Sequence, residues 1–289
     1  MKQQLILGTA NFGNVYGIAN KNSSLSPEDL KPLITWAQAN GLNHFDTATA
    51  YGASEEILGN YLDQSANPVV DTKLDSQSCV SGESIVDAAQ KSRDKLGIEC
   101  ISTLYLHDEG VLQSSSASEV VMGLKEVLSL GLAKQIGVSI YSEASIMNCK
   151  RILPELTVFQ VPENICDRRL FSSSLMEELA NTGNTFIVRS VFLQGLLLMD
   201  SDAVPRNLSL ARRNLELLQH FARKNSVTTM ELCLSYAQSI SWAKGIVVGT
   251  ASLNQLKEIV KCCATLPDGW NKAIATLPAE VIDPRKWSL

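Results

Sequence analysis

The sequence predicts an α/β protein that folds as a single (β/α)8 TIM barrel, one domain covering residues 1–289. Short apolar runs alternate eight times with segments of helical periodicity, which is the pattern of parallel βαβ units. The length also suits a closed barrel, which takes about 250 residues. A doubly wound open sheet is the alternative. It is disfavoured because no G-x-G-x-x-G follows a predicted strand and opens a helix.

Eight strands are expected from the apolar runs. Each run is short and lacks polar alternation, as in strands that are buried on both faces of a parallel sheet. The predicted strands are Leu5–Thr9, Asn43–Asp46, Val69–Thr72, Thr103–His107, Gln135–Ser139, Val158–Val161, Thr185–Arg189 and Gly245–Val248.

The helices between the strands are indicated by caps and apolar stripes. Ser26 is a candidate N-cap, Pro27 suits the first turn, and Gly41 ends an apolar stripe. Ser118–Leu130 repeats this pattern, and its inward face is predicted to hold Val120, Val121, Leu124, Val127 and Leu128. Further helices are predicted at Ser54–Tyr61, Ser81–Leu96, Ser142–Ile152, Ser173–Asn181, Leu208–Lys224, Thr228–Gln238 and Ser252–Cys262.

Composition excludes several classes of function. The net charge of −5, without a basic run, argues against nucleic acid as a partner. The seven cysteines are scattered without a CxxC or a Cys/His cluster, so we expect reduced thiols and neither a disulfide framework nor a metal site. The apolar runs are too short to span a bilayer or to form a signal peptide. We therefore expect a cytoplasmic protein without membrane contact.

Ionisable residues collect where the predicted strands end. Asp46 ends the second strand and Tyr51 follows it, while Lys73 and His107 stand at the ends of the next two strands. Each has an ordinary structural explanation: a cap, a packing aromatic, a surface lysine and a core histidine. Together they occupy the carboxyl ends of consecutive strands, which is where barrel enzymes place their active sites. The sequence therefore predicts an active site formed by these four residues.

The segments that carry these residues resemble the aldo-keto reductase family. Gly41-Leu-Asn-His-Phe-Asp-Thr-Ala-Thr-Ala-Tyr-Gly52 is similar to the signature of that family. The resemblance continues in family order over nearly the whole chain, through Thr72-Lys73, Leu104-Tyr-Leu-His-Asp108, Ile136-Gly-Val-Ser139, Gln160-Val-Pro-Glu-Asn164, Arg189-Ser190 and Val248-Gly249.

The resemblance implies NAD(P)H-dependent reduction of a carbonyl group, with Tyr51 as proton donor. A free tyrosine has a pKa of about 10. Lys73 is therefore expected to lower the pKa of Tyr51, and Asp46 to hold Lys73 in place. His107 is expected to orient and polarise the carbonyl oxygen.

Cofactor contacts are implied in the same way. Ser139, Gln160 and Asn164 would hold the nicotinamide carboxamide, and Arg189 stands where many family members stack an aromatic ring. A planar guanidinium can stack similarly. The implied cofactor-binding residues are Thr9, Ser139, Gln160, Arg189, Ser190, Phe192, Gln194, Gly195, Gly249, Thr250, Ser252, Gln255 and Glu258.

Two departures from the family pattern bear on the cofactor. Ile140 follows Ser139 where the family often has asparagine, which removes one amide contact. Ala251 and Gln255 stand where arginines usually grip the 2′-phosphate, and only Lys257 is nearby. NADP(H) is the favoured cofactor, with NAD(H) as the alternative.

The substrate and the class of function are less constrained. The motifs look most like a bacterial branch associated with nucleotide-sugar and polysaccharide pathways, which implies a sugar-derived, small-molecule carbonyl substrate. Two other functions stay open: a cofactor-binding regulatory barrel with little turnover, and a lyase or aldolase in which Lys73 forms a Schiff base. The family resemblance also suggests a monomer.

Overall fold

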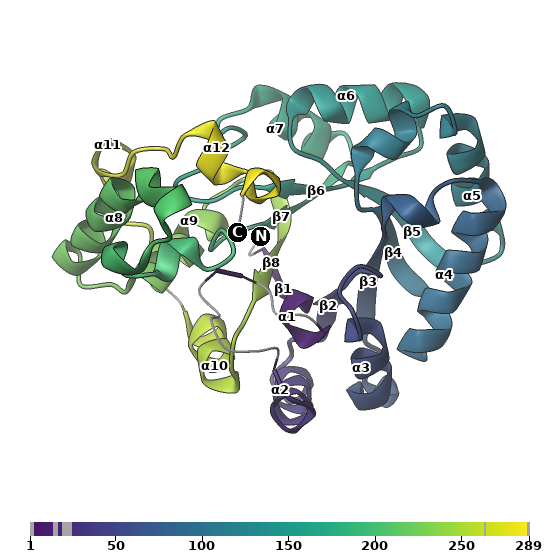
Figure 1. The fold of residues 1–289 in the computed structure, drawn as a ribbon, viewed down its shortest axis with the longest axis horizontal. Coiled ribbons are helices and arrows are strands. Elements are labelled where there is room, and N and C mark those ends of the chain that lie inside the picture. The colour runs from purple at the N-terminus through teal and green to yellow at the C-terminus, as the bar shows by residue number, and fades with distance from the viewer. Residues whose placement is uncertain (1–2, 14–16, 19–24, 263, 288–289) are drawn as a thin grey trace.

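Eight parallel strands close into one barrel in a computed structural model of the chain, which describes residues 3–13, 17–18, 25–262 and 264–287. Each strand pairs with the next along the chain, and β8 pairs with β1. The helices surround the strands (Figure 1). The predicted TIM barrel is therefore confirmed, and the open sheet is excluded because β1 and β8 share five registered residue pairs.

The strand positions agree with the prediction to within a few residues. β3 is longer than predicted and includes Lys73, whose backbone is thereby fixed by strand pairing with Tyr105. β4 begins two residues earlier and ends before His107, which lies just beyond the strand. The strands are β1 Gln4–Gly8, β2 His44–Asp46, β3 Val69–Leu74, β4 Ile101–Leu106, β5 Ala133–Ser139, β6 Val158–Pro162, β7 Thr185–Arg189 and β8 Ala243–Gly249.

The predicted helices also occur, and most begin one residue later than predicted. The reason is that Ser81, Ser142, Ser173, Thr228 and Ser252 are N-caps outside the helix, each accepting a hydrogen bond from a backbone N–H of the first turn. The helices are α1 Ala10–Gly13, α2 Pro27–Ala39, α3 Ser54–Tyr61, α4 Gly82–Leu96, α5 Ala117–Ser129, α6 Glu143–Ile152, α7 Ser174–Asn181, α8 Arg212–Lys224, α9 Thr229–Gln238, α10 Leu253–Lys261, α11 Trp270–Ala273 and α12 Ala279–Ile282.

Three helical predictions need correction. The start of Leu208–Lys224 is not α-helical, because a 3-10 segment at Arg206–Ala211 precedes α8 and Leu208 lies outside helical backbone angles. On α5, Leu128 is 41% exposed and Val121 is only partly buried, so the buried stripe is narrower than predicted. The short helices α1, α11 and α12 have no counterpart in the prediction, since four residues are too few to show a period.

A buried carboxyl group links the end of β6 to α9 through a hydrogen bond. Glu163 follows β6 and is fully buried, and it accepts hydrogen bonds from the Tyr236 hydroxyl at 2.7 Å and the Leu170 backbone N–H at 3.0 Å. Burial raises the pKa of Glu163 to about 8. The Glu163 backbone N–H also binds the carbonyl oxygen of Arg189, which anchors the end of β7.

Among the described residues, none of the helices combines the length and the apolar character needed to span a bilayer. No group of three or more His, Cys, Asp or Glu side chains could hold a metal ion among the residues described. Five of the described cysteines are buried and Cys100 is partly buried, while Cys263 lies outside the described residues.

Candidate active site

A cavity of about 510 Å³ opens at the carboxyl ends of the strands. This volume lies within the usual range for small-molecule sites, and the position is the one barrel enzymes use. The cavity is lined by most of the residues predicted from the sequence: Thr9, Asp46, Tyr51, Lys73, His107, Ser139, Gln160, Arg189, Ser190, Phe192, Gln194, Gly195, Gly249, Thr250 and Gln255.

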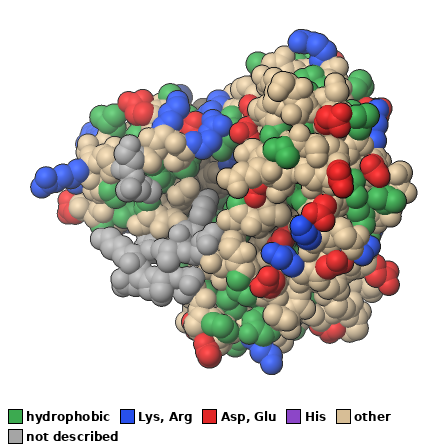
Figure 2. Space-filling view, turned by 45° about the vertical axis from the view of Figure 1, so that its right-hand side comes forward, with side chains coloured by type: hydrophobic (Ala, Val, Ile, Leu, Met, Phe, Trp, Pro, Cys, Tyr) green, Lys and Arg blue, Asp and Glu red, His purple; other side chains and the backbone are tan. Residues whose placement is uncertain are grey.

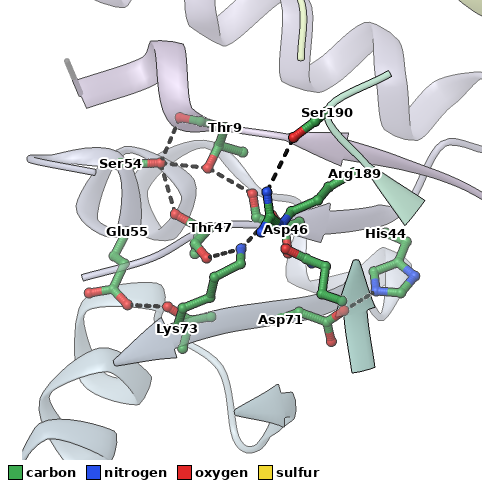
Figure 3. A network of polar contacts seen from close by, with 12 residues as sticks. Thr9, His44, Asp46, Thr47, Ser54, Glu55, Asp71, Lys73, Arg189 and Ser190 are labelled. Carbon is green, nitrogen blue, oxygen red and sulfur yellow. Dashed lines mark hydrogen bonds and ion pairs between the residues drawn. The ribbon is translucent and has the colours of Figure 1, made fainter. Parts of the chain in front are cut away.

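A buried ion pair lies at the base of the cavity. The ammonium nitrogen of Lys73 is 2.5 Å from Asp46 Oδ2, and the side chains are 1% and 4% exposed. Lys73 also donates to the carbonyl oxygen of Thr47 at 3.0 Å, and Gln160 Nε2 donates to Asp46 Oδ1 at 2.7 Å (Figure 3). Both carboxylate oxygens are therefore satisfied, which is what a buried charge needs.

Hydroxyl groups behind the ion pair fix the backbone on which Asp46 stands. Thr9 donates its hydroxyl proton to the Asp46 carbonyl oxygen at 3.1 Å, and Ser54 donates to the Thr9 hydroxyl at 2.7 Å. The Thr47 and Ser54 hydroxyls lie 2.9 Å apart, and Figure 3 shows the two side chains pointing toward each other. This network joins β1, β2 and the start of α3. Thr9 therefore lines the cavity, and its hydroxyl is engaged in the hydrogen bond to the backbone of Asp46.

The loop that carries Tyr51 is held by close backbone packing. The Tyr51 N–H binds the Ala48 carbonyl at 3.0 Å, and the Tyr51 carbonyl accepts from the Ser54 N–H at 3.2 Å. A Cβ atom on Gly13 of α1 would lie 2.1 Å from the Tyr51 carbonyl oxygen, far inside contact distance. Only glycine permits this approach, so α1 presses directly on the Tyr51 loop.

Burial raises the pKa of Tyr51 above its ordinary value, and the Asp46 carboxylate raises it further. Arg189 acts in the opposite direction. Burial and Asp46 therefore outweigh the lowering of the Tyr51 pKa that was predicted from Lys73. Lys73 lies 5.5 Å from the Tyr51 ring centre, but Asp46 pairs with it and offsets its charge. Tyr51 keeps its phenolic proton at neutral pH.

His107 lies beside Tyr51 with its ring at a right angle. The two ring centres are 5.9 Å apart and the planes meet at 86°. Burial, together with the charges of Lys73 and Arg189, lowers the pKa of His107 to about 4. The imidazole is therefore neutral at physiological pH, and one ring nitrogen carries a proton that it can donate.

Three residues predicted to contact a cofactor do not line the cavity. Asn164 accepts from the Cys166 N–H at 3.0 Å and donates to the Ser190 carbonyl at 3.2 Å, so it supports the neighbouring loop. Ser252 is the N-cap of α10 and binds the Gln255 N–H. Glu258 is exposed, because its position on α10 faces away from the barrel. Their contacts with a cofactor stay predictions.

The loop after β7 lines the cavity with unusual backbone geometry. Ser190, Leu193 and Gln194 have φ values of 63°, 47° and 54°, and Gly195 has 87°. Left-handed conformations are uncommon for residues other than glycine and concentrate at functional sites. Hydrogen bonds from Leu193 N–H to the Ser190 carbonyl and from Gly195 N–H to the Phe192 carbonyl hold the loop in this form.

Tyr141 and Arg285 are among the cavity residues that the sequence did not predict. Tyr141 lies two residues after β5, and both Arg189 and Arg285 lie over its ring, 4.6 Å and 3.4 Å from the centre. Tyr141 could have been predicted from the sequence, since it follows the end of a predicted strand. Arg285 could not, because it comes from the turn Pro284–Lys286, long after the last strand and outside any motif.

The cavity suits a nicotinamide ring. Nε and Nη2 of Arg189 are buried and make no hydrogen bond with any described residue, so a bound group with acceptor atoms would satisfy them. Ser139 lies in the same wall and is 2% exposed. At the end of β8 and directly after it, the part of the wall formed by Gly249, Thr250, Ala251 and Gln255 carries no Lys or Arg, and Lys257 on α10 lies 5.9 Å from the Trp36 ring centre.

Comparison with known proteins agrees with this geometry. The model of the "Aldo/keto reductase family" matches residues 4–277. L-glyceraldehyde 3-phosphate reductase of Escherichia coli K12 is 23% identical over 94% of this chain and 87% of its own length. Oxidoreductase sirO of Leptosphaeria maculans is 27% identical over 67% of this chain and 61% of its own.

A solved structure shows the same fold. The thermostable aldo-keto reductase Tm1743, crystallised with the inhibitor epalrestat, superposes with a TM-score of 0.70. The two chains are 19% identical, and the match covers 93% of this chain and 92% of the other. With the family model spanning nearly all of its length, this chain belongs to the aldo/keto reductase family and is an oxidoreductase of NAD(P)H-dependent carbonyl reduction.

Proposed function

We propose that this protein reduces a sugar-derived aldehyde or ketone to an alcohol, with Tyr51 as the proton donor. The observation that carries the proposal is the grouping of Tyr51, His107 and the Lys73–Asp46 pair around one cavity. The relative from Escherichia coli is named for L-glyceraldehyde 3-phosphate, a sugar-derived aldehyde, which supports this substrate class.

The chain's own residues account for delivery of the proton. A bound nicotinamide supplies the hydride that adds to the carbonyl carbon. Tyr51 is protonated at neutral pH and donates to the carbonyl oxygen as charge develops there. Lys73, 5.5 Å from the Tyr51 ring centre, stabilises the phenolate that remains. Neutral His107 donates a hydrogen bond to the same oxygen and orients the carbonyl.

Asp46 and Gln160 position Lys73 and do not act on the substrate. Asp46 holds the ammonium group at 2.5 Å, and Gln160 holds Asp46 through the second carboxylate oxygen. The side-chain nitrogen of Gln160 is thereby engaged, so its carbonyl oxygen is the atom it offers to a nicotinamide carboxamide, with Ser139 beside it. Arg189 would stack on the nicotinamide through the face that Tyr141 does not cover.

NADPH is the proposed cofactor, with weak discrimination against NADH. Bidentate arginine contacts are what usually distinguish a 2′-phosphate. The cavity wall at Gly249, Thr250, Ala251 and Gln255 offers none, and Gln255 Oε1 is occupied by the Ala251 N–H at 2.6 Å. The two nucleotides should therefore bind with affinities within about tenfold of each other.

Fluorescence titration with NADPH and with NADH tests this proposal. We expect saturable binding of both, and Arg189→Ala should weaken both by about tenfold, since stacking on a desolvated cation contributes about 1–2 kcal/mol. Arg168→Ala is the matched control: it removes an arginine that lies 5.2 Å from the Trp270 ring centre, away from the cavity. If neither NADPH nor NADH binds, the proposal is overturned.

No specific contact supports either of the two alternative functions, a lyase or aldolase that uses Lys73 and a regulatory barrel. A Schiff base requires Lys73 as a free amine, but its nitrogen is paired with Asp46 and bound to the Thr47 carbonyl. A regulatory barrel would not need an acid, an ion pair and a neutral imidazole around one cavity.

A further inference from the structure

The cavity carries an excess of positive charge in an acidic protein. Among its described lining residues, Lys73, Arg189 and Arg285 are cationic and only Asp46 is anionic, although the chain as a whole has a net charge of −5. Asp46 pairs with Lys73, and Asp283 pairs with Arg285 from outside the lining, so Arg189 is the lining cation that has no carboxylate pair among the described residues. Figure 2 shows Lys and Arg side chains gathered beside a hollow in the surface. Charge of one sign around a cleft attracts ligands of the other sign.

Arg285 is held in a defined position at this cavity. Its Nε and Nη2 donate to the two carboxylate oxygens of Asp283 at 2.9 Å and 2.8 Å, and its guanidinium carbon lies 3.4 Å from the centre of the Tyr141 ring. Asp283 is itself 6% exposed, so its position is fixed. None of the hydrogen bonds of the described residues uses Nη1 of Arg285. The bidentate pair with Asp283 and the packing on the Tyr141 ring therefore hold Arg285 in one position, with its Nη1 donor available to a ligand.

Arg285 packs on Tyr141, which places it in the part of the cavity wall that follows β5. Tyr141 follows β5, next to β4, whose end carries His107. Tyr141 is also close enough to Tyr51 to affect its titration. The nucleotide wall at Gly249–Thr250 follows β8, three strands further around the barrel. The C-terminal segment, in yellow in Figure 1, brings Arg285 to the barrel after α12.

From this arrangement we infer that Arg285, supported by Tyr141 and Asp283, binds an anionic group on the substrate, so that the preferred substrates are carbonyl compounds carrying a carboxylate or a phosphate. The inference rests on the proposed function, because it names the substrate class of the same site. Arginine is suited to both anions through its planar donor geometry. Arg285 is therefore a specificity-determining residue, whereas proton delivery stays with Tyr51.

Paired substrates that differ only in charge test this inference. For a carboxylate, the pair is para-carboxybenzaldehyde and its methyl ester; for a phosphate, it is glycolaldehyde phosphate and glycolaldehyde. The wild type should have a higher kcat/KM for the charged member of at least one pair, and the pair that shows it identifies the anion. Arg285→Gln should reduce the charged-to-neutral ratio of kcat/KM by about tenfold through KM, the scale of a partly exposed charge-assisted hydrogen bond.

Matched variants separate a binding role from a structural one. Lys286→Gln removes the same charge from the neighbouring exposed position, which does not line the cavity, and should keep the ratio. Arg285→Lys keeps the charge and should retain part of the preference. A wild type with no preference for either charged substrate overturns the inference and leaves the reductase standing. An Arg285→Gln variant that loses affinity for NADPH while keeping the ratio overturns it too. A wild type that reduces none of the four compounds removes the proposed function and the inference with it.

Discussion

Tyr51→Phe should lower kcat by about 10²- to 10⁴-fold, the usual contribution of a positioned acid. The substitution removes only the hydroxyl, so the ring contact with His107 at 5.9 Å between centres is kept. NADPH affinity should change little, because the lost proton is needed only when charge develops on the substrate oxygen. Steady-state kinetics beside a fluorescence titration of NADPH distinguishes the two quantities.

Tyr61→Phe is the control for this substitution. Tyr61 ends α3, is partly buried and does not line the cavity, so its hydroxyl should be dispensable for kcat. If Tyr51→Phe stays within about tenfold of the wild-type kcat, Tyr51 is not the general acid. The proton would then have to come from another group, such as His107.

Lys73→Met should abolish turnover and also destabilise the fold by about 3 kcal/mol, because it leaves the Asp46 carboxylate buried without its partner. Asp46 is 3% exposed, so water cannot replace the lost ammonium group readily. Chemical denaturation measures the change. The double variant Asp46→Asn with Lys73→Met should recover most of the stability and none of the activity, since the unpaired charge is removed as well.

An exposed ion pair provides the comparison. Lys91 and Asp87 on α4 lie 2.6 Å apart but are 70% and 59% exposed. Lys91→Met should therefore change the free energy of unfolding by less than about 1 kcal/mol. If Lys73→Met proves no more destabilising than Lys91→Met, the Lys73–Asp46 pair does not behave as a buried pair and the site has been described wrongly.

The sequence predicted the fold well because its signals are local. Ser26 shows why: a capping serine, a first-turn proline and an apolar stripe act within one helix, and the structure confirms the capping box there. The strands were found because parallel strands buried on both faces need short apolar runs. Asp46, Lys73 and His107 follow from the rule that strand ends converge, once the order of strands is known.

What the sequence could not show depends on the environment in three dimensions. The pKa of Tyr51 is governed by burial and by Asp46. How deeply Tyr51 is buried cannot be inferred from the residues that surround it in the sequence. The backbone angles of Leu193 and Gln194 are imposed by loop closure, against their ordinary preference. Arg285 reaches the cavity only through the path of the C-terminal segment, which leaves no periodic pattern.

Hydride transfer from the nicotinamide can be followed in a single turnover of the wild type with a carbonyl substrate and NADPH deuterated at the transferred position. We expect one alcohol for each NADPH consumed, with deuterium on the carbinol carbon and the oxygen-bound proton drawn from solvent. Consumption of substrate without NADPH oxidation, together with trapping of that substrate on Lys73 by borohydride, would show that the protein is not a reductase and would assign the cavity to Schiff-base chemistry.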